Sequence, residues 1–250
     1  MPISRTPMPT NIDDFVAPVC HQDVTMLYQD DDILLIDKPS GLLSLSGKNP
    51  KNWDSVHHRL VHGQVVDGRL STDGAKRIQA IDPMALTAAK LPHRLDFGTS
   101  GIMVVALTPA AAKHLNQQFQ QRLVQKHYIA MLDGWVSAEH GQINAAIAKG
   151  EFPRMNHCEL SGKPARSDYQ VLARLTAPAR SLVKYTPVTG RTHQLRLHSW
   201  LLGHPILGCD LYANQHSQQL APRLQLHASD LYFTHPITGQ AMHGHSPCPF

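Results

Sequence analysis

The segment Pro92-His-Arg-Leu-Asp-Phe-Gly-Thr-Ser-Gly101 decides how the rest of the chain is interpreted. It leads directly into an apolar stretch, residues 102–107, whose length and β-branched content predict a buried strand. Asp96 would then lie beside a rigid element, and Gly98 and Gly101 would let backbone or a ligand come close. A carboxylate held in this way can act as a nucleophile or a base.

The residues before this segment predict a small β-rich unit. Alternating apolar residues predict a hairpin of strands 25–28 and 33–37, followed by a turn at 38–41. A short strand at 42–45 and a helix at 53–61, with Asp54 in its first turns, are expected next. Residues 62–91 show no clear pattern, so they are either a mobile loop or a surface insertion, and we favour the insertion.

The residues after the segment predict more strands than helices. Thr108 and Pro109 are typical of a helix start, which predicts a helix over 110–122. A second helix is expected over 192–202, ended by Gly203. The predicted strands are 126–135, 141–148, the hairpin 165–175 with 180–186, the late pair 224–227 with 231–234, and a last one after the turn at 236–239. Short turns outnumber helical crossovers, which favours an α+β fold on a largely antiparallel sheet.

Composition indicates a globular protein rather than a membrane or secreted one. The 250 residues are 42% hydrophobic and 17% charged, with a net charge of +4. No apolar run approaches the roughly 20 residues that a membrane-spanning helix needs, and the first residues do not resemble a signal peptide. We therefore expect a cytoplasmic protein whose mildly basic balance permits an anionic partner.

The cysteines and histidines do not predict a metal site. The four cysteines are far apart and form no CxxC pair, so unpaired thiols are expected. His243, His245 and Cys248 invite a metal hypothesis, but a His-x-His without a second spaced pair is a weak signal. The prediction is therefore that no metal is bound.

Five motifs together carry a resemblance to a known family. HRLDFGTSG resembles the active-site motif of the RluA family of RNA pseudouridine synthases. Four more segments agree with that family in the same order: Ile36-Asp-Lys-Pro-Ser-Gly-Leu-Leu43, Lys126-His-Tyr-Ile129, Gly190-Arg-Thr-His-Gln-Leu-Arg-Leu-His198 and Gly203-His-Pro-Ile-Leu-Gly208. The resemblance implies a curved, mixed, mainly antiparallel sheet flanked by helices, with a central cleft. Because few residues precede the first predicted strand, we expect a catalytic domain over 25–250 after an extension, 1–24, without the separate N-terminal RNA-binding domain of some relatives.

The resemblance assigns catalytic roles that the residues alone leave open. Taken alone, Asp96 could be a turn-capping aspartate, Arg196 an exposed helix arginine and Tyr128 a core tyrosine. By resemblance, Asp96 is the reacting carboxylate, which either attacks the substrate or stabilises a sugar cation. Arg196 is expected to pair with Asp96 and keep it ionised, and Tyr128 is expected to stack on the uracil.

The resemblance also implies contacts with RNA. Arg94 could form only a surface salt bridge, but by resemblance it enters the RNA stack where the target base leaves. Lys38, Lys126 and Arg191 are weaker candidates for phosphate contacts. His193, Gln194 and His198 are expected to orient their helix.

The implied activity is isomerisation of specific uridines in structured RNA to pseudouridine. The expected substrates are large-subunit ribosomal RNA, a tRNA anticodon stem-loop, or both, and the expected protein is a monomer that needs no cofactor. The residues also bear on two other classes of protein, a protein kinase and a non-catalytic RNA-binding protein. His93-Arg94-Leu95-Asp96 differs in order from the kinase His-Arg-Asp, and the chain has no Gly-rich loop. A non-catalytic RNA-binding protein with this fold remains the alternative.

Overall fold

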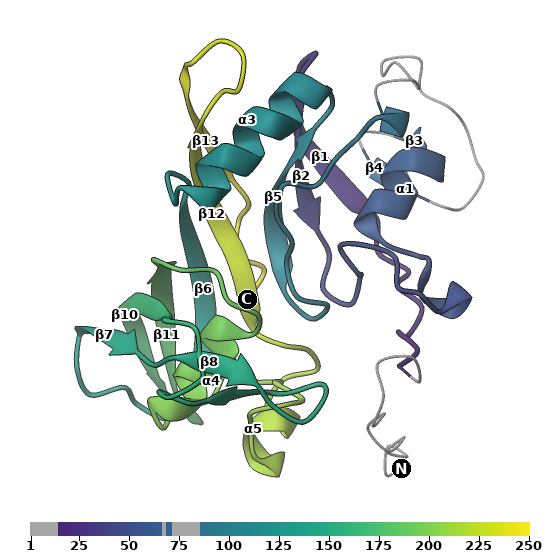
Figure 1. Cartoon of the computed structure of the whole chain (residues 1–250). Helices are drawn as coiled ribbons and strands as arrows, with labels where there is room; N and C mark the ends of the chain where they lie inside the picture. Colours follow the sequence, from purple (N-terminus) through teal and green to yellow (C-terminus); the bar gives the residue numbers. More distant parts are fainter. Residues whose placement is uncertain (1–14, 67–68, 72–85) are drawn as a thin grey trace.

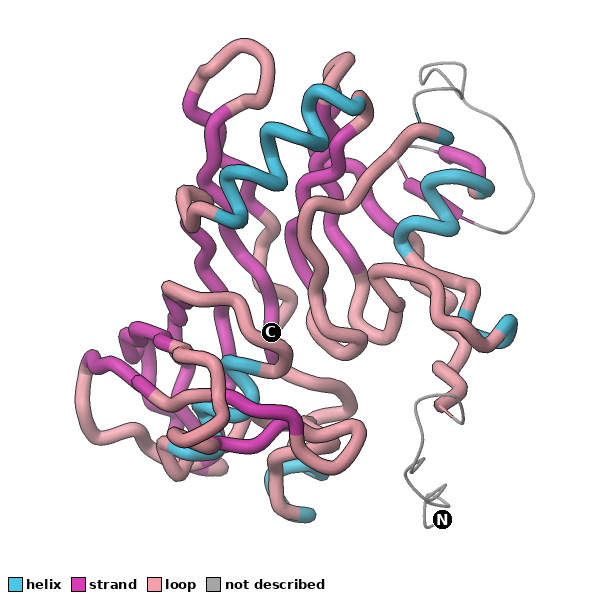
Figure 2. The backbone as a smooth tube through the Cα atoms, in the orientation of Figure 1, coloured by secondary structure: helices cyan, strands magenta, loops and turns pink. Residues whose placement is uncertain are grey.

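In the part of the chain that the structure describes, one mixed sheet of eleven strands organises the fold (Figures 1 and 2). The computed structural model describes residues 15–66, 69–71 and 86–250. Along the sheet the order is β3-β4-β1-β2-β5-β12-β6-β11-β10-β7, and β13 also pairs with β12. These strands are β1 Val24–Gln29, β2 Ile33–Lys38, β3 Gln64–Val66, β4 Arg69–Ser71, β5 Ser100–Ala106, β6 Gln125–Asp133, β7 His140–Asn144, β10 Arg166–Thr176, β11 Ala179–Pro187, β12 Leu226–Thr234 and β13 Ala241–His245.

Short helices and one small hairpin flank this sheet. The small hairpin consists of two strands that pair with each other and with no other strand of the described residues. Together with the largely antiparallel main sheet, these elements confirm the predicted α+β class. They are α1 Val56–His62, α3 Pro109–Gln120, α4 Gln194–Leu201, α5 Gln215–Gln219, a 3-10 turn at Pro50–Asn52, and the hairpin strands β8 Ile147–Lys149 and β9 Met155–His157.

Two hydrophobic cores lie on the two halves of the sheet. The first packs β2 and β5 against α1 and α3, and every residue of β5 is buried. The second packs β6, β10 and β11 against α4. Tyr128 of β6 is half-buried and packs against both cores, so its ring lies where they meet.

The two halves are joined by the pairing of β5 with β12. Among the paired strands of the described residues, this is the only parallel pair, and its register joins Ser100 to His227 and Gly101 to Ala228. Gly101 has a φ of +121°, and a Cβ placed there would lie 2.2 Å from the carbonyl oxygen of Ala228. The junction therefore needs a residue without a side chain at Gly101.

Most predicted elements are confirmed within a few residues. The strands of the first hairpin are antiparallel, as are β10 and β11. Thr108 caps α3 as expected, since its Oγ1 accepts a hydrogen bond from the Ala111 N–H at 3.2 Å. The helix expected at 53–61 begins later, because Ser55 is the N-cap and Asp54 lies before it, paired with Arg59 at 2.7 Å.

Three strand predictions were wrong. Residues 42–45 form no strand, only an isolated bridge from Leu43 to Ser55. Residues 141–148 contain parts of two strands, β7 and β8. The expected pair 224–227 and 231–234 is one strand, β12, in which a bulge between Ala228 and Asp230 interrupts the sequence pattern without ending the pairing.

Some predictions lie outside the described residues. The nature of the 62–91 segment stays a prediction, because residues 67–68 and 72–85 are not described, and the same holds for residues 1–14 of the extension. None of the described helices is both long and apolar enough to cross a bilayer.

The junction gives a stability prediction. Gly101→Ala should lower the free energy of unfolding by about 3 kcal/mol or more, because the new Cβ cannot avoid the backbone of Ala228. Gly239→Ala is the matched control. Gly239 also has a positive φ, +74°, but has open space around it, so only about 1–2 kcal/mol of backbone strain is expected. Urea titration of both variants measures the difference, and equal losses would contradict the steric account.

Candidate active site

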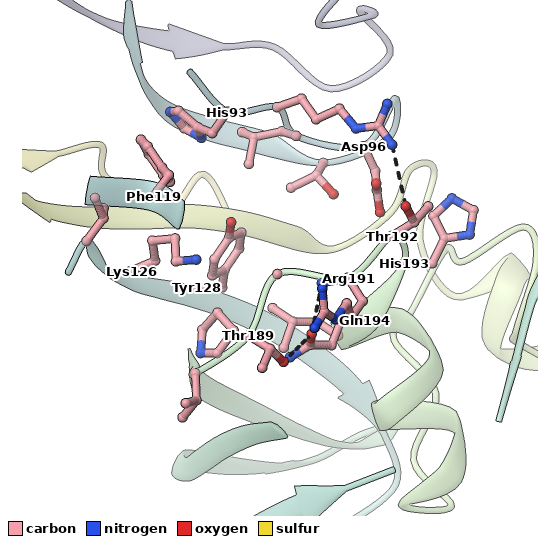
Figure 3. A pocket seen from close by; sticks show the side chains of 18 of the residues that line it. His93, Asp96, Phe119, Lys126, Tyr128, Thr189, Arg191, Thr192, His193 and Gln194 are labelled. Atoms are coloured by element: carbon pink, nitrogen blue, oxygen red, sulfur yellow. Dashed lines mark hydrogen bonds between the residues drawn. The ribbon is translucent and has the colours of Figure 1, made fainter. Parts of the chain in front are cut away.

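A cavity of about 550 Å³ lies at the meeting point of the two halves of the sheet (Figure 3). One wall is formed by residues 92–99, and the opposite wall is the loop before α4. The floor comes from β6 and from the end of α3. The lining includes Pro92, His93, Arg94, Leu95, Asp96, Thr99, Phe119, Arg122, Lys126, Tyr128, residues 187–196 and Leu226.

The backbone around Asp96 is fixed by the turn that follows β2. Leu95 is buried in the first core, so the next side chain, Asp96, is directed to the cavity. Side-chain and backbone groups of residues 40–44 bond to the backbone of 95–98, which makes the loop rigid. The bonds run from Gly41 N to Phe97 O (2.9 Å), Ser40 Oγ to Gly98 O (2.7 Å), Ser44 Oγ to Leu95 O (2.8 Å) and Leu95 N to Ser44 Oγ (3.1 Å).

Lys38 belongs to this support, so the prediction that it contacts phosphate was wrong. The side chain is fully buried, and its Nζ donates to the carbonyl oxygens of Pro39 (2.8 Å), Leu42 (2.7 Å) and Phe97 (3.3 Å). Burial lowers the pKa of Lys38 to about 7, against the opposing charges of Cys20, Asp96 and Asp37. Lys38 therefore ties the turn to the Asp96 loop and does not face solvent.

Asp96 is half-buried, and its carboxylate is open to the cavity. Within the described residues its carboxylate oxygens accept no hydrogen bond and form no ion pair; only its backbone oxygen is bonded, by Thr99 N at 3.1 Å. Burial and the negative charge of Asp96 both raise the pKa of Tyr128. Burial lowers the pKa of His193, and the charge of Asp96 opposes that shift. An acid group close to polar neighbours but bonded to none of them is free to engage a bound molecule.

Tyr128 forms the floor of the cavity. Its neighbours across the sheet are Tyr185 in β11 and Ala228 in β12, and Lys126 shares its face. Burial, followed by the charge of Asp96, raises the pKa of the Tyr128 hydroxyl. The side chain therefore stays a neutral phenol, with a ring that is fixed by packing on both cores.

Arg196 reaches the cavity from α4, but the direct ion pair expected with Asp96 is not formed. Its guanidinium bonds to the carboxylate of Asp210, and its Nε and Nη2 each lie 3.4 Å from Cys209 Sγ. It also lies over the Tyr212 ring, 5.5 Å from the centroid. Burial acts to lower the pKa of Arg196, but Cys209, Asp210 and Asp96 together raise it. Arg196 is therefore a fixed buried cation that acts on Asp96 through its field.

The loop before α4 is held by Gln194. Its Oε1 accepts from Thr189 Oγ1 (2.7 Å) and Arg191 N (3.0 Å), and its Nε2 donates to Arg166 O and Ser167 Oγ, both at 2.9 Å. His198 is buried and lies 3.0 Å from Ser167 Oγ through Nδ1. Both side chains therefore orient the helix, as the sequence predicted.

His193 begins α4 in an unusual conformation. It has a φ of 56°, which few residues other than glycine adopt, and its Nδ1 lies 2.9 Å from the Tyr212 hydroxyl oxygen. Such strain is found mainly at functional positions. His193 lines the cavity and also begins the helix.

Basic side chains dominate the rim and lining. Arg94 is exposed at the mouth, where its Nη2 donates to Thr192 Oγ1 at 3.4 Å. Burial lowers the pKa of Lys126, which lies beside Tyr128. Arg191 bonds to Pro164 O at 3.2 Å through Nε. The described lining has five arginine and lysine side chains and one carboxylate, Asp96, so the cavity attracts anions.

Sequence reasoning missed the residues behind Arg196. Cys209, Asp210 and Tyr212 come from a loop after α4, directly beyond the motif that ends at Gly208. Arg196 could have indicated them, since a buried guanidinium needs an acidic partner. Only the fold could show that the partner is Asp210.

Comparison with known proteins identifies the family of this chain. Residues 32–199 match the family model described as RNA pseudouridylate synthase. The protein called dual-specificity RNA pseudouridine synthase RluA is 40% identical in Yersinia pestis over 220 residues, 87% of this chain and 96% of the relative. In Escherichia coli K12 it is 39% identical over 229 residues, 91% of this chain and 94% of the relative.

Solved structures show the same fold. Human RNA Pseudouridylate Synthase Domain Containing 1 superposes with a TM-score of 0.67 at 27% identity, over 93% of this chain and 86% of the human one. Human RNA Pseudouridylate Synthase Domain Containing 4 has a TM-score of 0.62 at 24% identity, covering 90% and 88%. The chain therefore belongs to the RluA family of RNA pseudouridine synthases.

Proposed function

We propose that this isomerase converts uridines in two kinds of RNA, large-subunit ribosomal RNA and a tRNA anticodon stem-loop, and that Asp96 is the reacting group. Two relatives that share about 40% of its residues over most of their length are named dual-specificity enzymes. The observation that carries the catalytic role is the unpaired carboxylate of Asp96 in a cavity with Tyr128 and several cations.

The reaction asks for a carboxylate that can act on the sugar or the base. The bond from ribose C1′ to uracil N1 breaks, a bond from C1′ to C5 forms, C5 loses its proton and N1 gains one. Asp96 can form a covalent bond with the substrate or stabilise the positive charge on the sugar while the base turns. Either role needs an ionised oxygen that no protein donor occupies, and the open carboxylate of Asp96 meets that need.

The surroundings of Asp96 supply a fixed electrostatic field. Arg196 is buried and held by Asp210, so its charge does not reorganise when a substrate binds. We assign Tyr128 to stacking on the displaced uracil, with its neutral hydroxyl available to exchange a proton near C5.

RNA reaches the cavity along its basic rim. A uridine inside a stem or loop has to leave its stack before Asp96 can act on it. Arg94, exposed at the mouth, is suited to fill the vacated place, and Arg191 and Lys126 are suited to phosphate. Action as a monomer in the cytoplasm stays a prediction from the sequence.

Replacing the proposed reacting group tests the central role. Asp96→Asn should reduce pseudouridine formation by roughly 10⁴-fold or more, because an amide cannot supply the charge, while the affinity for a stem-loop stays unchanged. Tritium release from RNA labelled at uracil C5 measures turnover. Asp168→Asn, a surface carboxylate paired with Arg166, is the control. Normal turnover by Asp96→Asn would remove this residue from the mechanism, whereas no turnover by the wild-type protein would favour the binding-protein alternative.

The hydroxyl of Tyr128 can be separated from its ring. Tyr128→Phe should keep RNA affinity and lower kcat by about 10²-fold, in the range of lost proton-transfer assistance. Tyr128→Leu should also raise KM, because it removes the stacking surface. Steady-state kinetics on one stem-loop compares the two variants. Full activity of Tyr128→Phe would show that only the ring is used.

Arg94 should affect base displacement more than binding. Arg94→Ala is expected to slow the rise in fluorescence of a 2-aminopurine placed beside the target uridine, because the gap in the stack is no longer filled. Arg191→Ala is the matched comparison. It should weaken binding uniformly and reduce the salt dependence by about one charge. A loss of affinity with normal fluorescence kinetics in Arg94→Ala would count against the assigned role.

A further inference from the structure

Three histidines and one aspartate form a cluster across β6, β12 and β13. Asp230 of β12 lies directly opposite His127 of β6 on one side and His245 of β13 on the other. Residues paired in this way project from the same face of a sheet. His243 lies two positions before His245, so it projects from that face as well.

The cluster is separate from the active site. Lys126 and Tyr128, the neighbours of His127, line the catalytic cavity. Because side chains alternate along a strand, His127 and the cluster lie on the opposite face of the sheet. In Figure 1 these three strands run side by side, with β12 between β6 and β13.

The contacts within the cluster converge on one carboxylate. His243 Nε2 lies 2.9 Å and His245 Nδ1 lies 3.0 Å from the same oxygen, Oδ1 of Asp230. His127 Nδ1 lies 3.9 Å from the other oxygen, Oδ2. The ligand atoms of Asp230, His243 and His245 all lie within 4.8 Å of one another.

We propose that Asp230, His243 and His245 bind one divalent transition-metal ion, with Zn²⁺ as the best fit and His127 beside the open position. Two imidazole nitrogens and one carboxylate oxygen are a donor set that Zn²⁺ accepts, and water or a fourth side chain completes the tetrahedron. Mg²⁺ and Ca²⁺ prefer oxygen donors, so they fit the cluster poorly.

The hydrogen on each imidazole ring can move so that the nitrogen facing Asp230 becomes free to bind a metal ion. The nitrogens that face Asp230 now donate to it, because a carboxylate only accepts. A neutral imidazole can carry its hydrogen on either nitrogen, so a metal can take the inner lone pair while the hydrogen moves to the outer nitrogen. Among the described residues no group bonds to the outer nitrogens of His243 and His245, which leaves them free for water.

Access and rigidity both favour binding. The side chains of His243 and His245 are 47% and 55% exposed, so an ion can enter from solvent. The His243 ring stacks on Tyr232 with centroids 4.2 Å apart and planes 2° apart, which fixes its orientation. Asp230, by contrast, is only 18% exposed and is held in the middle strand.

A second acidic and histidine cluster lacks these properties. Asp30, Asp32 and His235 also lie close together, but Asp30 Oδ1 accepts from the backbone N–H groups of Asp32 (2.9 Å) and Ile33 (2.8 Å). His235 is buried, and its Nδ1 accepts from Thr238 N at 3.0 Å. That cluster closes turns, and its lone pairs are already used.

The two histidines near the C-terminus are therefore part of a metal-ligand set whose other members lie elsewhere in the sequence. His243 and His245 lacked a second ligand pair in the sequence, which argued against a metal. The fold supplies Asp230 from the preceding strand and His127 from a strand more than a hundred residues earlier. Cys248, the third residue of the sequence hypothesis, is not part of the cluster.

Calorimetric titration of the metal-free protein with Zn²⁺ tests the proposal. One ion per chain should bind, and His243→Ala, His245→Ala and Asp230→Asn should each weaken binding by at least about tenfold. His140→Ala, which removes an exposed histidine of β7 outside the cluster, should leave the affinity unchanged. Co²⁺ in place of Zn²⁺ should give the visible absorption of a tetrahedral nitrogen and oxygen site.

Thermal melting guards against variants that fail to fold. Zn²⁺ should raise the Tm of the wild-type protein, because it binds only the folded pairing of β12 with β13. The double variant His243→Asn with His245→Asn keeps polar side chains and should melt normally without metal, yet show no shift with Zn²⁺. The site would be overturned if the wild-type protein bound no Zn²⁺ at about 0.1 mM, or if the double variant bound it equally well.

Discussion

The close approach of β5 and β12 is the constraint on which the rest of the structure depends. Only two residue pairs join these strands, yet they connect two half-sheets with separate cores. A Cβ at Gly101 would overlap the backbone of Ala228, so the absence of a side chain there sets how near the halves can come. The cavity opens at this seam because Asp96 precedes β5 while Tyr128 belongs to β6, the next strand beyond β12.

Buried polar groups turn this seam into a rigid site. Lys38 has no access to water, and burying its amine is costly. The three carbonyl oxygens around it offset part of that cost, and one of them belongs to Phe97 in the loop that carries Asp96. Ser40 and Ser44 bond to the same loop. A residue that resembled a surface cation in the sequence thus fixes the position of the carboxylate from behind.

Two arginines of the site differ in how freely their side chains can move. Arg196 is buried and paired with Asp210, so it contributes a fixed field. Arg94 is exposed at the mouth and held by a single long hydrogen bond, so it can move to a ligand. Asp96 lines the same cavity, and its carboxylate has no protein partner in the described chain. Because a direct pair with Arg196 would occupy its oxygens, the indirect arrangement keeps the carboxylate available.

The sequence by itself determined the family, the α+β class, most strands and the candidates Asp96, Tyr128 and Arg196. These follow from local patterns: the β5 run is apolar throughout, Thr108 and Pro109 mark a helix start, and the motifs are contiguous. The tertiary structure decided which groups meet. In the folded chain Lys38 is buried and Arg196 pairs with Asp210. The two strands expected at 224–234 form one strand, β12, with a bulge. His127 and Asp230 lie next to His243 and His245. Local sequence encodes backbone preference and periodicity, whereas partners of buried charges come from strands far apart in the chain, and only the sheet order places them together.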